Sequence, residues 1–425
     1  MASTYLTKTM GNPPGNSRIG TFSFWIKFSG LSTSAEKYLF STYENGNNRS
    51  ICKFNTDGAF EFQARSGGNI DLRYDTNRLF RDTNAWYNIV IATDTTQSTA
   101  SNRVKIYVNG VQETSFSTST VPSQNVVPHY LYGGIVRTIG AYGDGNTAKW
   151  DGLMSYVAFI DGTQELPTVF GETDATTGEW KIKTTITPSS AWGDNGYLIL
   201  KDGNSVTDQS GEGNNFTVNG TLTKTEDCPS NVFATLNPLQ SGSITFSNGN
   251  NTQGNTSSTG QNALSTLGAV SGKFYAEVKC TAVGSNGTNV GFVNLSKSNL
   301  MNQSITPGQD NFSAGLYSNG GPIFYSSETT FATVGSISDG DIIQLAMDLD
   351  NGYLYWGKNG TYLNSGVPTS GSTGTGGLAT SNLGDGHIGF GMWQRNSATA
   401  SWNFGNGYFG TTAVSSAGTN ASGNG

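Results

Sequence analysis

Apolar and polar residues alternate along most of the chain, in short runs separated by turn residues. In residues 21–28 every second position is aromatic or aliphatic, which is the period of a strand with one buried face. Similar patterns predict strands at residues 21–28, 57–62, 86–92, 104–110, 135–140, 153–160, 179–182, 196–200, 272–279, 289–293, 339–350, 353–356, 387–392 and 402–404. Short strands with turn residues at about every 8–12 positions are typical of a β-sandwich or barrel.

Three segments lack this regularity. Residues 161–240 alternate polar turns with brief apolar runs. Residues 247–261 are rich in Gly, Ser, Thr and Asn, which predicts a mobile loop, with the tip of a long hairpin as the alternative. Residues 411–425 are small and polar, and we expect a flexible tail.

Composition excludes several classes of protein. Charged residues make up 12% of the chain and aromatic residues 11%, so it can bury enough apolar surface to avoid disorder. The residues that coiled coils need are scarce, and no apolar run reaches the roughly 18–20 residues of a membrane span. The first residues contain no apolar core of a signal peptide, so none is expected. The net charge of −7 argues against nucleic-acid binding.

The three cysteines, Cys52, Cys228 and Cys280, are far apart in the sequence. A disulfide framework and a zinc cluster both need closer spacing. A single bridge remains open, but the chain must be stabilised mainly by its apolar cores.

The first part of the chain resembles a laminin-G or pentraxin-like sandwich of the concanavalin type. The resemblance rests on residues 24–26, 86–91, 104–111, 150–152 and 156–162. It implies a jelly-roll domain over residues 1–165.

The last part resembles a SPRY domain, which is another two-sheet sandwich. The matching residues are 272–278, 340–348, 351–352 and 358–360. The fold expected is therefore all-β, with a first sandwich at 1–165, an irregular connector at 166–245, a SPRY-like sandwich at 246–410 and a tail at 411–425.

The connector contains a segment that resembles the first strand of a laminin-G unit. Residues 196–200 and 208–216 carry this likeness, although such a strand normally precedes the rest of the domain. We hypothesise that this segment folds back to complete the first sandwich.

The pairing of these two modules is similar to virion proteins of tailed bacteriophages, especially marine ones. This resemblance implies an exposed tail fibre, head fibre or capsid decoration located on the virion. The implied partners are other virion proteins and a glycan or protein of the host cell surface. A homotrimer is expected by analogy with fibres alone.

Catalysis by a nucleophile would need a histidine held beside it, and the chain has His129 and His387. We expect structural or surface roles for both. Glycoside hydrolysis would need two carboxylates across a groove, and Asp348 and Asp350 share a strand face. Their place before an Asn-Gly pair favours a turn instead. No catalytic residue is assigned, and the chain is predicted not to be an enzyme.

Calcium is the metal that the sequence could hold. Asp144, Asn146 and Asp151 cluster in a Gly-rich loop, and oxygen ligands of this kind suit Ca²⁺. Laminin-G units often bind calcium at their rim, but a plain turn is the alternative.

Aromatic side chains in loops are the candidate ligand-binding residues, because a flat ring can stack on a sugar. They are Tyr130, Tyr132 and Tyr142 in the first module and Trp393 and Tyr408 in the second. Core burial is the alternative for each, and it is favoured for Trp393 at the end of a strand.

The sequence therefore predicts a non-enzymatic virion protein that attaches to bacterial surface glycans. A purely structural decoration or adaptor protein is the first alternative. A polysaccharide-degrading appendage is the second.

Overall fold

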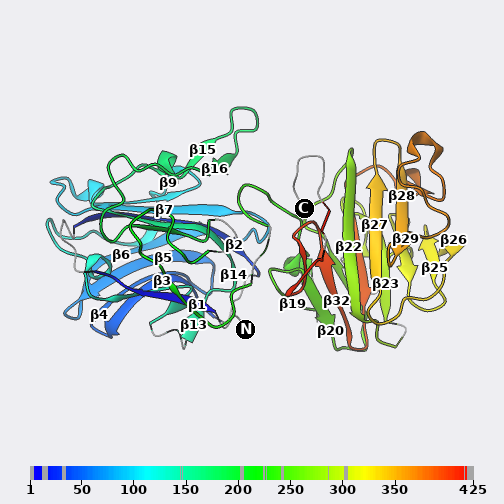
Figure 1. The fold of residues 1–425 in the computed structure, drawn as a ribbon, viewed down its shortest axis with the longest axis horizontal. Coiled ribbons are helices and arrows are strands. Elements are labelled where there is room, and N and C mark those ends of the chain that lie inside the picture. The colour runs from blue at the N-terminus through cyan, green and yellow to red at the C-terminus, as the bar shows by residue number, and fades with distance from the viewer. Residues whose placement is uncertain are drawn as a thin grey trace. The chain divides into compact units, whose positions relative to one another are not determined.

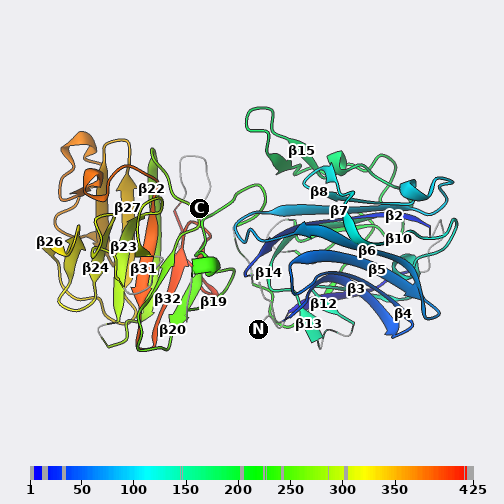
Figure 2. The ribbon, with the colours of Figure 1, turned by 180° about the vertical axis from the view of Figure 1, so that it is seen from behind.

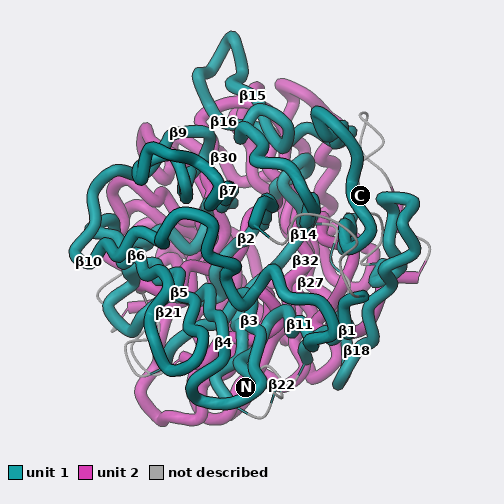
Figure 3. Tube along the Cα trace, turned by 90° about the vertical axis from the view of Figure 1, so that its left-hand side faces the viewer, with its two compact units in different colours: residues 1–232 teal, residues 233–425 magenta. Residues whose placement is uncertain are grey.

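The chain forms two compact units, residues 1–232 (unit 1) and 233–425 (unit 2) (Figure 3). The computed structural model describes residues 4–11, 18–30, 35–143, 145, 147–201, 205–223, 225, 227–240, 244–285, 287–300, 305–415 and 417–418. Strands account for 47% of the chain, and the helical turns among the described residues are all short 3₁₀ segments. The prediction of an all-β protein built from sandwiches is confirmed.

Unit 1 is a sandwich of two antiparallel sheets (Figure 1). In the described residues, sheet 1 has the order β10 (Phe116–Thr120), β6 (Asn69–Leu79), β5 (Ala59–Ser66), β4 (Asn48–Phe54), β3 (Lys37–Asn45), β11 (Val136–Ile139), β1 (Tyr5–Thr9) and β18 (Thr217–Asn219). Sheet 2 has the order β17 (Tyr197–Ile199), β14 (Gly152–Asp161), β2 (Ile19–Phe28), β7 (Tyr87–Asp94), β8 (Val104–Val108) and β9 (Val111–Gln112). Two small ribbons pair β12 (Ala141–Tyr142) with β13 (Thr147–Lys149) and β15 (Gly171–Thr173) with β16 (Trp180–Ile182).

Phenylalanine rings from neighbouring strands of one sheet and from strands of opposite sheets fill the core of unit 1. The ring of Phe22 on β2 lies 4.5 Å from that of Phe159 on β14, measured between centroids. Phe28 on β2 meets Phe54 on β4 edge-on at 4.8 Å, which joins sheet 2 to sheet 1. Each such buried side chain stabilises the fold by about 1.5–3 kcal/mol. The strict alternation of β2 is therefore what places a continuous aromatic layer between the sheets.

Residues 166–232 of the expected connector belong to unit 1, and the rest of it belongs to unit 2. β17 adds to the edge of sheet 2, where Tyr197 lies opposite Phe159 of β14. β18 adds to the edge of sheet 1, where Val218 lies opposite Leu6 of β1. Both strands come from the region hypothesised to complete the first sandwich, and they extend one edge of each sheet.

The same segment also covers the outer face of sheet 2. Phe170, Ile182 and the partly buried Trp180 pack there against Trp25 and Trp86. In the described part of the chain, sheet 1 has no matching apolar cluster on its outer face. Sheet 1 is thus the sheet whose outer face presents polar side chains.

A buried ion pair fastens the end of unit 1 to this covered face. Lys27 Nζ lies 2.8 Å from Asp227 Oδ2, and the side chains are 2% and 1% exposed. Trp86 Nε1 donates a hydrogen bond of 3.1 Å to Asp227 Oδ1. Residues 200 positions apart in sequence are thereby held together where water does not reach.

Unit 2 is also a sandwich of antiparallel sheets (Figure 2). In the described residues, sheet 3 has the order β19 (Thr245–Ser247), β20 (Thr252–Asn255), β32 (Ala398–Asn403), β22 (Lys273–Ala282), β27 (Ile342–Asp348), β28 (Tyr353–Lys358) and β29 (Thr361–Tyr362), with β30 (Leu378–Ala379) also on β28. Sheet 4 has the order β21 (Gln261–Leu264), β31 (Ile388–Gln394), β23 (Thr288–Asn294), β24 (Ser313–Tyr317), β25 (Pro322–Tyr325) and β26 (Thr329–Thr333). A ribbon pairs β33 (Tyr408–Phe409) with β34 (Thr412–Ala413).

The prediction of a loop over residues 247–261 is wrong. β20 pairs with β32, and β21, which begins at Gln261, pairs with β31. The strand has no apolar pattern because its buried residues are polar. Trp402 Nε1 donates to Gln253 Oε1 at 3.2 Å, and Asn255 Nδ2 donates to the Gln394 carbonyl at 2.8 Å. Hydrogen bonds replace apolar burial in this strand.

Two smaller expectations also change. The predicted tail begins with a strand, because Thr412 pairs with Phe409 across the β33–β34 ribbon. All three cysteines are described, and all three are free thiols. The open alternative of a single disulfide bridge is therefore not realised.

We predict that Asp227→Ala destabilises unit 1 by about 3 kcal/mol, because it leaves the Lys27 ammonium buried without its carboxylate. Glu172→Ala is the control, since Glu172 forms an exposed pair with Lys181 and such pairs contribute little. Differential scanning calorimetry of the full chain measures the effect. Equal melting temperatures for the two variants would contradict the prediction.

Candidate functional site

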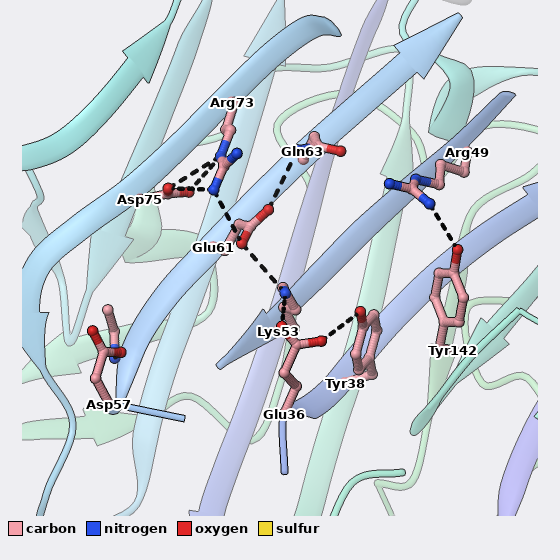
Figure 4. A network of polar contacts seen from close by, with 11 residues as sticks. Glu36, Tyr38, Arg49, Lys53, Asp57, Glu61, Gln63, Arg73, Asp75 and Tyr142 are labelled. Carbon is pink, nitrogen blue, oxygen red and sulfur yellow. Dashed lines mark hydrogen bonds and ion pairs between the residues drawn. The ribbon is translucent and has the colours of Figure 1, made fainter. Parts of the chain in front are cut away.

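A polar hollow of about 460 Å³ lies over β3, β4, β5 and β6 of sheet 1 (Figure 4). Charged, amide and phenol side chains dominate its lining. The lining residues are Glu36, Tyr38, Arg49, Ile51, Lys53, Asn55, Glu61, Gln63, Arg73 and Tyr142. We call this feature the sheet 1 hollow.

Strand alternation builds the floor of the hollow. On β4, Phe54 points into the core while Lys53 points outward, and on β5 Phe62 is buried in the core beside the outward Glu61. The strand register then aligns the outward residues, because Lys53 lies opposite Glu61 and Glu61 lies opposite Asp75. Lys53 and Glu61 are thus neighbours of opposite charge across the strands, and the neighbouring carboxylates of Glu61 and Asp75 share the guanidinium of Arg73.

These neighbours form one connected network (Figure 4). Lys53 Nζ contacts a carboxylate oxygen of Glu36 and lies 3.4 Å from Glu61 Oε2. Arg73 binds Asp75 with two nitrogens, at 2.7 and 3.1 Å, and its Nη2 lies 3.6 Å from Glu61. The Glu61 carboxylate lies between two cations, and the Arg73 guanidinium binds Asp75 through two nitrogens. Both groups therefore have little freedom to move.

The network also fixes the protonation of its members. Burial, and next the negative charge of Glu36, raise the pKa of Tyr38 well above its ordinary value. The Tyr38 hydroxyl therefore stays neutral and donates to Glu36 Oε2 at 3.0 Å. The hydrogen bond to Asp75 raises the pKa of Arg73.

Two groups in the hollow retain unused hydrogen-bonding capacity. Gln63 is 6% exposed, and its Nε2 donates to Glu61 Oε1 at 3.4 Å while its Oε1 has no partner. Arg49 Nη1 donates to the Tyr142 hydroxyl at 3.0 Å, and its Nε has no partner. An unsatisfied buried polar group costs about 1–3 kcal/mol. A bound molecule that offered a donor to Gln63 and an acceptor to Arg49 would recover part of that cost.

Tyrosine rings border one side of the hollow. The ring of Tyr142 lies 5.0 Å from that of Tyr38 and 5.4 Å from that of Tyr43. Tyr43 is an exposed aromatic residue. Aromatic surface beside polar groups suits a ligand with one apolar face and polar edges.

Tyr142 is the sequence-predicted residue that lines this hollow among those the structure describes. Tyr132 is half-buried and packs against His129, with ring centroids 5.1 Å apart. The prediction for Tyr130 is wrong, because its side chain is 0% exposed and its hydroxyl bonds to Thr93 Oγ1 at 2.6 Å inside the core.

In unit 2 Trp393 is buried, as the interpretation favoured from the sequence expects, and the weaker ligand-binding prediction for it does not hold. Trp393 is 6% exposed on β31, and the guanidinium of Arg395 lies 5.2 Å from its ring centroid. Tyr408 is half-buried on β33, and its role in binding remains a prediction.

The calcium prediction remains untested. Asp144 and Asn146 lie outside the described residues. Asp151 is described, and its carboxylate lies 3.7 Å from Lys37 Nζ. Within the described ranges, His, Cys, Asp and Glu side chains form no group of three or more that could hold a metal ion.

The residues weighed for catalysis have structural partners. His129 is buried in a 3₁₀ turn, where its Nδ1 lies 2.8 Å from Thr42 Oγ1. His387 is exposed and its Nδ1 lies 3.1 Å from Ser296 Oγ. Asp348 Oδ1 accepts from the Asn351 amide at 3.1 Å, and Asp350 Oδ1 accepts from the Gly272 amide at 2.7 Å. The turn interpretation of the two aspartates is confirmed.

The sequence interpretation did not identify Lys53, Glu61, Gln63 and Arg73 as site residues. Their signal is a period of two in which the residues between apolar ones are charged or amide side chains, as in residues 49–54 and 59–65. Such a pattern predicts a strand, but the cross-strand register that gathers the polar residues depends on the whole sheet.

Comparison with known proteins shows what the first unit is similar to. Residues 3–167 match the model of the concanavalin A-like lectin/glucanases superfamily. The match covers the strands that carry the sheet 1 hollow. No curated protein matches the chain.

Solved structures similar to this chain include SPRY domains and a pentraxin. The SPRY domain of human HERC1 is 14% identical, with 39% of this chain and 96% of that chain covered and a TM-score of 0.32. The TRIM65 PSpry domain is 12% identical, with 40% and 92% covered and a TM-score of 0.31. A native heptameric SAP-like pentraxin from Limulus polyphemus is 16% identical, with 38% and 71% covered and a TM-score of 0.28.

No helix in the described ranges has both the length and the apolar character of a membrane span.

We predict that unit 1 loses stability as the pH falls below about 6.5. Burial lowers the pKa of His129 in the folded unit, so below the ordinary value of about 6.5 the unfolded chain binds a proton that the folded unit does not. The stability that this group contributes is present above that pH and is lost as the pH falls through the lowered folded pKa. Melting temperatures between neutral and mildly acidic pH measure the effect.

The loss of melting temperature at acidic pH should be smaller in the variant His129→Gln, whatever the absolute stability of that variant. His387→Gln, in unit 2, is the control and should leave the decline of unit 1 as it is. A decline that is unchanged in His129→Gln would refute the assignment.

Proposed function

We propose that this chain is a non-enzymatic display protein of a bacteriophage particle, and that the sheet 1 hollow binds glycans of the bacterial surface. The observation that carries the proposal is the buried Gln63 Oε1, which has no partner beside a fixed network of charges and a tyrosine. The superfamily match of residues 3–167 to lectins and glucanases supports a saccharide ligand.

The groups of the hollow suit the hydroxyls and ring of a sugar. Gln63 Oε1 and Arg49 Nε are buried without partners, so rotation of these side chains would present an acceptor and a donor to a sugar. Tyr142, which Arg49 already orients, offers a ring beside them. Because the Lys53–Glu61–Arg73 network is held by mutual contacts, little side-chain entropy is lost on binding.

The carboxylates of the hollow favour binding over hydrolysis. A glycosidase uses two carboxyl groups, one as an acid and one as a base or nucleophile. Glu36 and Glu61 both contact the ammonium of Lys53, so either would have to leave this ion pair to act. We therefore assign them to ligand positioning.

Display of many copies on one particle would compensate for a weak affinity of each single site. Many copies engaging one surface raise avidity well beyond the affinity of a single copy. The net charge of −7 would help to keep a densely displayed protein soluble. The resemblance of the two-module sequence to virion proteins supports this location, with other virion proteins and the host surface as partners.

We predict that Gln63→Leu weakens binding to a bacterial surface polysaccharide by about tenfold, because it removes the free acceptor. A glycan array with the full chain identifies the ligand, and isothermal titration then measures its affinity for each variant. Gln112→Leu makes the same change on exposed β9 of sheet 2 and should bind as the unchanged chain does.

Equal affinity for Gln63→Leu and Gln112→Leu would exclude the sheet 1 hollow as the binding site. Release of reducing sugar from the bound polysaccharide would instead support the degrading alternative. An absence of any glycan signal would favour the structural decoration protein.

We predict that an antibody against unit 2 labels purified phage particles in immunogold electron microscopy. Label at the tips of fibres agrees with attachment, whereas label spread over the capsid agrees with decoration. Particles from the same phage that bear no label would exclude a virion protein.

A further inference from the structure

A second hollow, of about 200 Å³, lies on sheet 3 of unit 2. It is lined by Tyr275, Glu277, Gln344, Gly360, Thr361 and Tyr362. We call it the sheet 3 hollow. None of its residues is a candidate site residue in the sequence analysis, and it lies in a different unit from the site proposed above, so it does not depend on that proposal.

A row of residues in register builds this hollow across adjacent strands. Glu277 of β22 lies opposite Gln344 of β27, and Gln344 lies opposite Gly357 of β28. Gly357 in turn lies opposite Tyr362 of β29. The neighbours of Glu277 on β22, Ala276 and Val278, are in the core, so the row is on the outer face.

The glycine makes room for the Gln344 side chain in the middle of the row. A Cβ at Gly357 would lie 3.0 Å from Gln344 Oε1 and 3.1 Å from Gln344 Cβ, which is tighter than an ordinary contact. Gln344 therefore lies directly over the glycine. Tyr362 on β29 and the half-exposed Tyr275 on β22, an interior strand, both line the hollow.

The polar groups of the hollow are mainly acceptors. Gln344 is 8% exposed, and its Oε1 has no hydrogen-bond partner. The Glu277 carboxylate accepts from the Tyr275 hydroxyl at 2.6 Å. None of the lining residues is cationic. Lys273, on the same strand as Glu277, pairs with Asp348 at 2.8 Å. Lys279, two residues beyond Glu277, does not line the hollow.

Glu277 sets the electrostatic field in this hollow. Burial raises the pKa of Tyr275 and of Tyr362, and the negative charge of Glu277 raises both further. Both phenols therefore stay neutral, and their rings keep the electron-rich faces that attract cations.

We propose that the sheet 3 hollow binds an organic ammonium group. Two tyrosine rings attract such a cation, the Glu277 carboxylate balances its charge, and the Gln344 oxygen accepts from it or from its CH groups. An anion would meet the carboxylate without a cationic partner. Rotation of the Gln344 amide, whose terminal torsion is soft, presents its oxygen to the ligand.

This chemistry occurs in choline headgroups, in methylated lysine side chains and in amino sugars. The volume is below the roughly 300 Å³ at which pockets for larger ligands begin, so one such group fills it. Choline, trimethyllysine and glucosamine are therefore the probes, with N-acetylglucosamine as the uncharged partner of glucosamine.

The test is a titration of the full chain with choline chloride and with its neutral isostere, in which a tert-butyl group replaces the trimethylammonium. Choline should bind at least about tenfold more tightly than the isostere. Glu277→Gln should remove this preference, whereas Asp385→Asn, which removes a carboxylate from an exposed loop of the same unit, should keep it. Glucosamine that binds better than choline would identify a sugar amine as the source.

A second pair of variants tests the proposal independently, in case Glu277→Gln loses binding because it does not fold. Tyr362→Phe keeps the ring and should keep choline binding, whereas Tyr362→Leu should weaken it by about tenfold. Equal binding of choline and its isostere, or choline binding that survives Glu277→Gln and Tyr362→Leu, would overturn the proposal. No binding of any of the ammonium probes would overturn it as well.

Discussion

The register of strands β3 to β6 is the constraint on which unit 1 depends. It places Phe54, Phe60 and Phe62 on one face and Lys53, Glu61 and Gln63 on the other. Because side chains alternate with a period of two, a slip by one residue would bury the charges and expose the rings. The aromatic core thus fixes the register, and the register fixes the polar network. Core and candidate site are two consequences of one alignment.

The segment after residue 165 decides which faces of unit 1 remain free. It adds β17 and β18 to the edges of the sheets and covers the outer face of sheet 2 with Phe170, Trp180 and Ile182. The Lys27–Asp227 pair then holds the end of this cover in place. A ligand that approaches unit 1 consequently meets sheet 1 rather than sheet 2. In unit 2 the sheet 3 hollow also lies on one sheet, where the Gln344 side chain lies over Gly357 in a row of paired residues.

The fold was largely predictable because strands such as β2 and β8 alternate apolar and polar residues cleanly. The site strands β3, β4 and β6 were not predicted. The outward residues of β4 and β6 include charged ones that interrupt the apolar signal, and on β3 the adjacent Leu39 and Phe40 are both in the core, which breaks the period of two. Tyr130 was misjudged because local sequence does not show which side of a Gly-rich segment faces the core, whereas the burial favoured for Trp393 at the end of a strand is what the structure has. Tyr142 was found by its type alone. Gln63 could not be found, because its free oxygen depends on contacts across the sheet.

A crystal structure of the chain with a bound oligosaccharide from the bacterial surface tests the central claim most directly. We expect density for a sugar ring within hydrogen-bond distance of Gln63 Oε1, with one face against Tyr142. The Lys53–Glu61–Arg73 network should keep its contacts, because it is already in place without ligand. An empty sheet 1 hollow at saturating sugar, with density on another face of unit 1, would contradict the assignment of the site.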